Sequence, residues 1–353
     1  MTSRLAFGFL VPALCLLAAC SDSTPNRCAD EKVDGENTSK YVIERFDRDF
    51  AELDTNDTLQ KNSLVLSLKN KYGLFVDMYT GRMLEVGELS DRRTMSYVDS
   101  FLHHPAYKAF YNATDSVFSG GLKSEEEKIS KAFARYHHFF PENTLPKRFF
   151  STFSGFYSQI AIDEAENMSI SLEYYLGSSE ETFNNWYQWI DGINSYQMPN
   201  LCREKIAPDV VLGWLMYQFP EENPNSVKLL DEMVYNGKLM YALKAVLPDE
   251  SDCNLMGYTE PQLKWCQENE GQMWQYIKEY KHLYTADRLT ISKYINPAPT
   301  TQFFPEDSPG KSGIWLGWRI VSSFMENNKS YSLSQLMKEN DSQKILQMSR
   351  YNP

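Results

Sequence analysis

PDVVLGWLMYQF (208–219) and SVKLLDEMVYNGKLMYALKAVL (226–247) are the two stretches that decide the fold of this chain. Apolar residues recur in both at spacings of three and four, which is typical of the buried face of a helix. The turn-forming run 220–225 separates them, so we expect two consecutive helices that form the core. Gly237 lies on the apolar face of the second helix, where a missing side chain permits close packing.

The helical pair lacks two histidines four residues apart, the pattern that points both imidazoles toward one metal ion. The doublets His103–His104 and His137–His138 do not replace it, because adjacent side chains on a helix point about 100° apart. His282 stands alone, and no G-x-S-x-G elbow for a serine nucleophile is present. The sequence therefore predicts no catalytic residues, no bound metal and no cofactor.

Carboxylates and aromatic residues give weaker functional signals. Asp231, inside LLDEMV, is the carboxylate that we expect to be half buried, and burial is one way to raise the pKa of an acid. Most of the seven tryptophans fall at helical spacings that favour core packing. Trp186 and Trp189, in FNNWYQWIDG, are the exceptions, and they leave a glycan-binding surface as an alternative.

The first twenty residues, MTSRLAFGFLVPALCLLAAC, are typical of an export signal. Arg4 precedes an apolar run that ends in small residues before Cys20, and LAAC resembles a bacterial lipobox. That resemblance implies a mature chain that begins at an acylated Cys20, although an ordinary signal that happens to end in cysteine is the alternative. Ser21, where inner-membrane lipoproteins have aspartate, favours a lipid-anchored protein at the outer membrane, facing the periplasm.

Residues 21–39 are polar and lack apolar spacing, so we expect a flexible tether in which Cys28 is unpaired or loosely paired. Exported chains permit disulfides. Cys253 and Cys266 are the first choice for a bridge. Cys202 competes for either partner, and buried free thiols are the other possibility.

The net charge of −12, from 35 basic and 47 acidic residues, argues against nucleic acid as a partner. No stretch after the signal is long and apolar enough to span a bilayer. The lipid on Cys20 is thus the expected contact with the membrane. We expect one mostly helical domain over 40–353.

Residues 40–146 contain amphipathic runs that predict a set of scaffold helices. The stretches 149–162 and 169–176 are instead rich in β-branched and aromatic residues, and the turn-like DEAEN separates them. They predict two neighbouring strands, which we expect to be antiparallel. The part 147–353 then holds the sheet and the central helices. The fold class is α+β, predominantly helical, with a small antiparallel or mixed sheet.

PEDSPGKSGIWLGWRIVSSFM (305–325) is the last distinctive stretch. Asp307 to Gly310 predicts a loop, and Gly313 and Gly317 line the opening of a helix with small residues that permit close backbone approach. Arg319 follows Trp315 by about one turn. We expect it to be exposed, with a paired internal arginine as the alternative.

Several stretches together resemble the gliding-motility lipoprotein B family of the Bacteroidota: the lipobox, ISLEYYLG, LLDEMVYNGKLMY, GYTEPQLKWCQENE, DSPGKSGIWLGWRIVSSFM and QKILQMSRY. The most specific is DSPG-x2-G-x-W-x-GW, with Asp307, Ser308, Pro309, Gly310, Gly313, Trp315, Gly317 and Trp318, followed by Arg319. The resemblance implies an envelope lipoprotein needed in gliding relatives for surface movement linked to type IX secretion. It also implies protein partners in the motility or secretion machinery.

A weaker similarity is to a family of zinc peptidases with an HExxH helix. In that alignment Gly213 and Tyr217 take the histidine positions, Trp214 takes the glutamate, and Asn236 stands where an acidic residue belongs. With Asp231 these residues form a candidate degenerate site, and the similarity implies a zincin-like architecture without its metal. The predicted function is a non-catalytic envelope protein that binds partners. A zincin-like metallopeptidase or other envelope hydrolase and a glycan-binding lipoprotein remain the alternatives.

Overall fold

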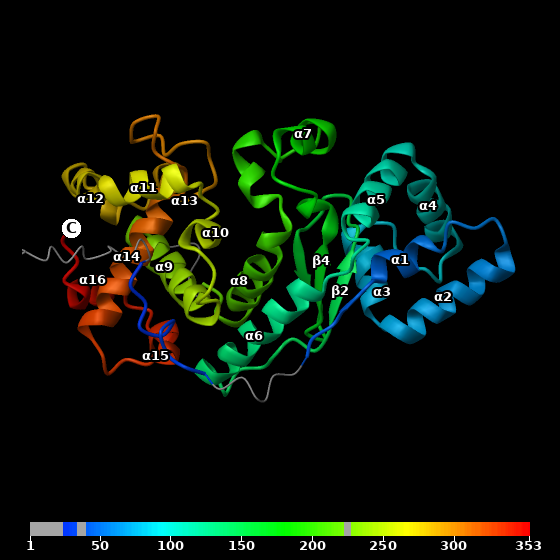
Figure 1. The fold of residues 1–353 in the computed structure, drawn as a ribbon, viewed down its shortest axis with the longest axis horizontal. Coiled ribbons are helices and arrows are strands. Elements are labelled where there is room, and N and C mark those ends of the chain that lie inside the picture. The colour runs from blue at the N-terminus through cyan, green and yellow to red at the C-terminus, as the bar shows by residue number, and fades with distance from the viewer. Residues whose placement is uncertain (1–23, 34–39, 222–226) are drawn as a thin grey trace, which may run out of the picture.

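The computed structural model describes residues 24–33, 40–221 and 227–353. The predicted signal peptide, Cys20 and residues 34–39 of the predicted tether lie outside the described residues. The body is elongated, with α1 to α5 at one end, a small sheet in the middle and α9 to α16 at the other end (Figure 1). The described part is mostly helical with a four-stranded mixed sheet, which confirms the predicted α+β class.

The helices and strands have the following bounds. The helices are α1 (Phe46–Ala51), α2 (Thr58–Tyr72), α3 (Phe75–Met78), α4 (Arg92–His103), α5 (Pro105–Val117), α6 (Lys123–Phe139), α7 (Glu180–Thr182), α8 (Ile206–Gln218), α9 (Leu229–Val246), α10 (Asp252–Met256), α11 (Glu260–Glu268), α12 (Glu270–Glu279), α13 (Arg288–Ile295), α14 (Ser312–Asn327), α15 (Leu333–Lys338) and α16 (Ser342–Ser349). The strands are β1 (Ile43–Glu44), β2 (Phe149–Thr152), β3 (Ile160–Ile162) and β4 (Met168–Ser171).

The sheet has the order β1-β2-β4-β3, with β3 antiparallel to β4 and the other pairs parallel. The predicted strand 149–162 is therefore wrong as a single element, because the chain leaves the sheet between β2 and β3. Gly155 and Phe156 there have φ of 66° and 67°, values that interrupt an extended strand. The predicted antiparallel pairing holds for β3 and β4 alone, which are joined through the turn 163–167.

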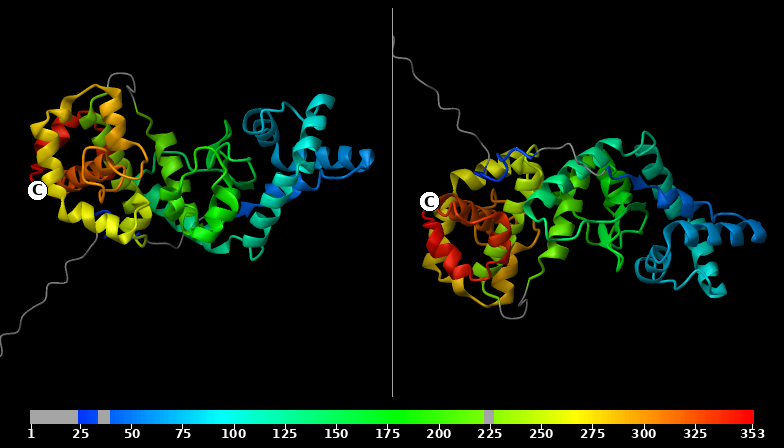
Figure 2. Two further views of the ribbon diagram at one scale, coloured as in Figure 1. Left: turned by 90° about the horizontal axis from the view of Figure 1, so that it is seen from above. Right: turned by 90° about the horizontal axis from the view of Figure 1, so that it is seen from below.

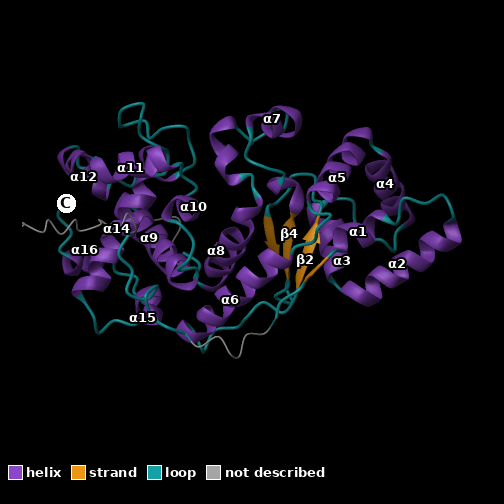
Figure 3. Ribbon diagram, in the orientation of Figure 1, coloured by secondary structure: helices purple, strands orange, loops and turns teal. Residues whose placement is uncertain are grey.

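Strand β2 separates two hydrophobic cores. Successive side chains of a strand point to opposite faces, and here Phe149 packs into the core of α6, α8, α9 and α14 while Phe150 packs into the core of α1 to α5. Both rings are fully buried. Figure 3 shows the strands between these two groups of helices, so the sheet belongs to both halves of the molecule.

Helices α8 and α9 form as predicted, and the most extensive partner of α9 is α14. Their backbones nearly touch at two glycines. A Cβ on Gly317 would lie 1.8 Å from the carbonyl oxygen of Met233, and one on Gly237 would lie 2.3 Å from the carbonyl of Gly317. Real Cβ atoms do not approach so closely, so glycine is required on both sides. This confirms the close packing predicted for Gly237 and Gly317.

The segment 24–33 lies against the C-terminal helices, at the opposite end of the molecule from α1 to α3 (Figure 2). Cys28 is 6% exposed. Arg135 of α6 donates to Cys28 O at 2.8 Å, and Asn26 donates to the backbone oxygen of Tyr241 in α9 at 2.8 Å. The predicted flexible tether is therefore wrong for 24–33, because backbone carbonyls and a polar side chain hold this stretch on α6 and α9.

The predicted Cys253–Cys266 bridge is not formed: Cys28, Cys202, Cys253 and Cys266 are all free thiols. Cys266 lies on the fully buried face of α11 beside Tyr258, whereas Cys253 is partly exposed in the first turn of α10. The free-thiol alternative thus describes the structure. None of the described helices is long and apolar enough to cross a bilayer.

Candidate functional site

A cavity of about 200 Å³ lies where α8 and α14 begin. Lys205 precedes the first residue of α8, and Lys311 precedes the first residue of α14. The remaining walls come from the 3-10 helix Ser195–Asn200, the connection between α10 and α11, and the loop before α14. The lining residues are Gln159, Tyr196, Gln197, Asn200, Lys205, Asp209, Leu212, Leu255, Met256, Gly257, Tyr258, Gln262, Pro297, Ala298, Pro309, Gly310 and Lys311.

The DSPG motif forms one wall of this cavity. Thr301 donates through its hydroxyl to Pro309 O at 2.7 Å, and Tyr258 donates to Gly310 O at 2.7 Å. A Cβ on Gly310 would lie 2.2 Å from Ala298 O, so only glycine lets the loop segments around Gly310 and Ala298 approach this closely. The motif therefore has a structural reason for its glycine, and its last residues reach the cavity.

A partly buried carboxylate and a buried ammonium face each other at the start of α8. Lys205 Nζ donates to Asn254 O at 2.6 Å and lies 3.8 Å from Asp209 Oδ1. Asp209 Oδ2 accepts from Gln159 Nε2 at 2.9 Å and from the hydroxyl of Tyr175 at 3.1 Å. Burial raises the pKa of Asp209, and Lys205 opposes that rise most strongly. The carboxylate is thus held in place by three different elements.

Lys311 is the second cation of the cavity. Its Nζ donates to Met256 O at 2.6 Å. Loss of water and, less strongly, the nearby Lys205 lower the pKa of Lys311 to about 8, against the pull of Asp209. An ammonium whose pKa lies this close to neutrality is a common feature of binding and catalytic sites.

Glu173 lies behind Tyr175, at the end of β4, and is fully buried. Its Oε1 accepts from the backbone N and the hydroxyl of Ser154, both at 2.7 Å, and from Phe156 N at 3.2 Å. Oε2 has no partner among the described residues. Burial raises the pKa of Glu173 to about 7. The Glu173 carboxyl group holds the chain in place where it leaves β2, and its protonation state depends on pH near neutrality.

The sequence-based candidate site missed these four groups. Glu173 stood in a strand-like apolar run, and Lys311 stood in a motif valued for its glycines. A usable signal existed for Lys205 and Asp209, which are four residues apart at the head of an otherwise apolar helix. Charges at that spacing share one helix face, so their burial with α8 could have been expected.

The predicted degenerate site is not brought together by the structure. Gly213 packs on Ile160 of β3, and Trp214 is fully buried in the core. Tyr217 is 46% exposed. None of the three lines the cavity at the start of α8.

Asp231 and Asn236 of the same predicted site have local roles in α9. Asp231 is half-buried, and its Oδ2 accepts from Lys228 N at 2.8 Å, which caps the helix. Asn236 donates to Glu232 O at 2.8 Å within the same helix. Each side chain therefore forms a hydrogen bond with the backbone of its own helix or of the residue that caps it.

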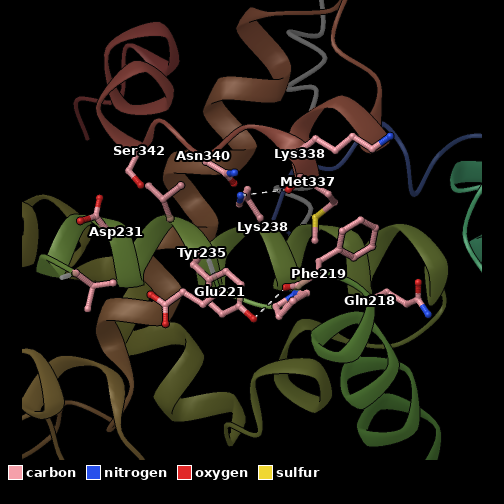
Figure 4. Close-up of a pocket in the computed structure, with 13 residues that line it drawn as sticks. Gln218, Phe219, Glu221, Asp231, Tyr235, Lys238, Met337, Lys338, Asn340 and Ser342 are labelled. Carbon is pink, nitrogen blue, oxygen red and sulfur yellow. Dashed lines mark hydrogen bonds between the residues drawn. The ribbon is translucent and has the colours of Figure 1, made fainter. Parts of the chain in front are cut away.

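Asp231 also borders a wider cavity of about 590 Å³ between α9 and the segment from α15 to α16 (Figure 4). There Tyr235 donates to Phe219 O at 3.2 Å, and Lys238 donates to Glu339 O at 2.8 Å. Both polar groups thus bond to backbone carbonyls that join neighbouring elements. Two of its lining residues, Glu221 and Val227, flank in sequence the residues that the structure does not describe, so we place the candidate site at the start of α8.

The second half of the DSPG motif has packing roles. Trp315 and Trp318 are buried, and Gly313 lies against Tyr294 of α13. Arg319 Nε donates to Glu270 Oε1 at 3.0 Å. The expected exposed arginine is therefore wrong: Arg319 is paired, as the alternative predicted, and its side chain is partly buried at 29% exposed.

His104, His138 and Trp186 have local contacts. His104 accepts from Ala106 N at 3.3 Å and so caps α5, and His138 Nε2 lies 2.8 Å from Glu31 Oε1. Trp186 packs against Phe110, with ring centroids 5.1 Å apart, while Trp189 is 81% exposed. Within 24–33, 40–221 and 227–353, no three His, Cys, Asp or Glu side chains are placed to share a metal ion.

The fold and cavity define a mostly helical α+β protein with a polar, lysine-bearing pocket at the start of its core helices. Residues 28–353 match the sequence model of the gliding motility protein GldB family, and the chain belongs to that family. It is therefore a member of a family of gliding-motility-associated lipoproteins of the cell envelope. No curated protein matches the chain, and no solved structure does.

Proposed function

We propose that this protein is a lipid-anchored component of the cell envelope that supports surface movement by binding partner proteins rather than by catalysis. The family match over 28–353 carries the proposal. The lipobox resemblance adds the anchor at Cys20, at the outer membrane and facing the periplasm. The partners belong to the motility machinery and to the type IX secretion linked to it.

The packed segment 24–33 supports a defined orientation at the membrane. Thr24 N donates to Asp252 Oδ2 at 2.5 Å, and Thr24 follows Cys20 by four positions along the chain. Four extended residues span at most about 14 Å. The acyl chains would therefore hold the C-terminal helices close to the bilayer and direct the α1 to α5 end toward partners.

Fatty-acid labelling of the full chain tests the anchor. We expect cells fed an alkyne fatty acid to label the wild-type chain and Cys15→Ser, but not Cys20→Ser. Cys15 is a matched control because it is the other cysteine of the predicted signal. A wild-type chain without label would contradict lipid anchoring.

Complementation tests the role in movement. In a gliding host that lacks its own family member, we expect the wild-type chain to restore colony spreading and secretion of type IX cargo, and Cys20→Ser to restore neither. Normal spreading with Cys20→Ser would remove the anchor from the function, and restored spreading without restored secretion would remove the link to type IX secretion.

The non-catalytic part of the proposal has a separate test. The full chain in detergent, purified without chelator or affinity metal, is expected to carry no stoichiometric zinc and to leave peptide substrates intact. Peptide cleavage that stops when a chelator is added would replace this part of the proposal with a metallopeptidase.

A further inference from the structure

A third cavity, of about 460 Å³, lies where α12 and α16 end, at the end of the molecule that carries the C-terminus (Figure 1). Its volume is within the range of about 300–1,000 Å³ that is usual for ligand pockets. The described residues that line it are Trp274, Lys278, Lys281, Leu283, Tyr284, Leu346, Arg350, Tyr351 and Asn352. Three of them are cations and none is an acid. In a chain of net charge −12, this pocket attracts anions.

Two of the three cations occupy backbone positions that usually belong to glycine. Lys281 follows α12 with a φ of 57°, and Arg350 follows α16 with a φ of 53°. A left-handed residue just after a helix is most often glycine, which has no Cβ to clash. A cation near the C-terminus of a helix interacts favourably with the helix dipole, but the last turn offers that interaction without strain. Both helix ends therefore accept strain and place a cation at the rim of one pocket.

The positive charge of the rim is not neutralised by the described residues. None of the three cations forms an ion pair within 24–33, 40–221 and 227–353. Glu270 of α12 is bonded elsewhere, since its Oε1 accepts from Arg319 Nε at 3.0 Å and from the Tyr351 hydroxyl at 2.7 Å. The rim is therefore available to an external anion.

The floor of the pocket is apolar and aromatic. Trp274 and Leu283 are 4% and 6% exposed. Tyr351 packs edge-on against Trp274, with ring centroids 5.2 Å apart. Lys278 Nζ lies 5.6 Å from the centroid of the Trp274 ring, so a cation and the aromatic floor face the same space. Cations above an apolar floor fit an anion with an apolar body better than a fully hydrated inorganic anion.

Hydrogen bonds connect this pocket to the segment that leads to the predicted anchor. Arg27 Nη1 donates to Lys329 O at 2.9 Å, and Asn328 Nδ2 donates to Met348 O at 3.1 Å. Met348 is two positions before the arginine of the rim, and Arg27 is seven positions after Cys20. An acylated Cys20 would therefore place a bilayer at the end of the molecule that holds the pocket.

We propose that this pocket binds the headgroup of an anionic phospholipid in the bilayer that carries the anchor. Lys278, Lys281 and Arg350 hold the phosphate, and Trp274 contacts the glycerol and the first carbons of the acyl chains. Tyr284 at the rim is 51% exposed, and tyrosine and tryptophan are typical of the interface between membrane and water. The choice of a lipid as the anion rests on the proposed anchor, whereas the anion-binding rim does not.

Native mass spectrometry of the full chain in detergent tests the proposal, because it separates covalent acyl mass from bound lipid. The probes are the anionic dioleoylphosphatidylglycerol and the zwitterionic dioleoylphosphatidylcholine at equal concentrations. We expect at least fivefold more chains to carry one phosphatidylglycerol than one phosphatidylcholine. The same spectra show whether each chain is acylated.

Glycine variants remove the two strained cations without disturbing the fold. The double variant Lys281→Gly, Arg350→Gly should carry at least fivefold less phosphatidylglycerol than the wild type, while its urea midpoint should not fall, because glycine adopts positive φ without strain. Arg350→Lys keeps the charge and should bind like the wild type. Lys264→Gln is the matched control, because this lysine is exposed on α11 and pairs with the exposed Glu268, and it should also bind like the wild type.

Equal binding of the two lipids, or undiminished phosphatidylglycerol binding by the double glycine variant, would overturn the site. Displacement of the lipid by an equal concentration of inorganic phosphate would assign the pocket to a free anion, and displacement by hexaglutamate would assign it to an acidic protein segment. Both results would overturn the lipid. Chains that lack acyl mass but prefer phosphatidylglycerol would contradict the anchor alone, whereas acylated chains without that preference would contradict the pocket alone.

Discussion

One sequence motif builds two regions of opposite character. DSPGK (307–311) lines a polar cavity with a backbone glycine and a lysine whose pKa is lowered, whereas SGIWLGW (312–318) packs without side-chain charge against α9. In the first region, groups from several distant segments share one small space. In the second, two backbones meet at glycines. The comparison shows that helix packing depends on spacing along the chain, while the site depends on which segments the packing brings together.

The largest effect is expected where the backbones meet. Gly317→Ala would place a methyl group 1.8 Å from the Met233 carbonyl oxygen, so α9 and α14 must separate along the centre of the core. We expect the free energy of unfolding to fall by about 3 kcal/mol or more, measured by urea unfolding of the full chain. Gly120→Ala is the control, because a Cβ there meets nothing within 4 Å, and it should change stability by less than about 0.5 kcal/mol. Equal urea midpoints for both variants would show that the crossing tolerates separation.

The next effect comes from the buried acid beside the polar region. The pKa of Glu173 rises from 4.5 to about 7 on folding, so the folded state keeps a proton that the unfolded chain loses. The stabilisation is full below about pH 4.5 and is lost as pH rises through about 7. The Glu173→Gln variant has no titrating group at this position. Its free energy of unfolding relative to that of the wild type should therefore rise by up to about 3 kcal/mol between pH 4.5 and pH 8.

Urea unfolding at pH 5 and at pH 8 measures this difference, with the exposed Glu127→Gln as control. The relative stability of the control should stay constant between the two pH values. A constant difference for Glu173→Gln as well would mean that the carboxyl group is ionised at both pH values, and that its burial does not make folding depend on pH.

The crossing of α9 with α14 and the cavity at the start of α8 also differ in how far the sequence predicts them. The apolar spacing of 208–219 and 226–247, and the glycines at 237 and 317, predicted the core helices and their close approach, because such signals are local. The cavity joins Lys205 to Lys311, more than a hundred residues later, and no local pattern encodes that meeting. The parallel pairing of β2 with β4 was missed for the same reason, since a hairpin is the simplest interpretation of two neighbouring strands.

The packed segment 24–33 adds polar contacts on the outer side of α9. Removing those that Arg135 makes should have an intermediate effect. Arg135 donates to Cys28 O at 2.8 Å, to Glu31 O at 2.9 Å and to Ala245 O at 2.8 Å. Hydrogen bonds of charged groups are worth about 1.5–3 kcal/mol, and 1.4 kcal/mol corresponds to a factor of ten. Arg135→Met should therefore speed alkylation of the buried Cys28 thiol at least about tenfold.

Mass mapping of the alkylated peptide at Cys28 gives this rate in the full chain. Lys131→Met is the matched control, because this lysine is exposed on the same helix, and its rate should equal that of the wild type. If Arg135→Met also leaves the rate unchanged, the segment is held by its other contacts, such as that of Asn26 with α9.

The smallest effect is expected at α15, which packs on α9 from the side of the wider cavity. Ser332 caps this six-residue helix, since its hydroxyl oxygen accepts from Gln335 N at 3.1 Å. The side-chain oxygen of Gln335 in turn accepts from Ser332 N at 2.8 Å. Ser332→Ala should cost about 1 kcal/mol in urea unfolding, whereas Ser330→Ala, at an exposed position just before the helix, should cost almost nothing. Because α15 buries Leu333 and Leu336 in the core, a loss for Ser332→Ala no larger than that for Ser330→Ala would mean that apolar contacts alone hold the helix on α9. The polar cap would then add little to the stability of the contact between α15 and α9, just as charged side chains add little to the contact between α9 and α14.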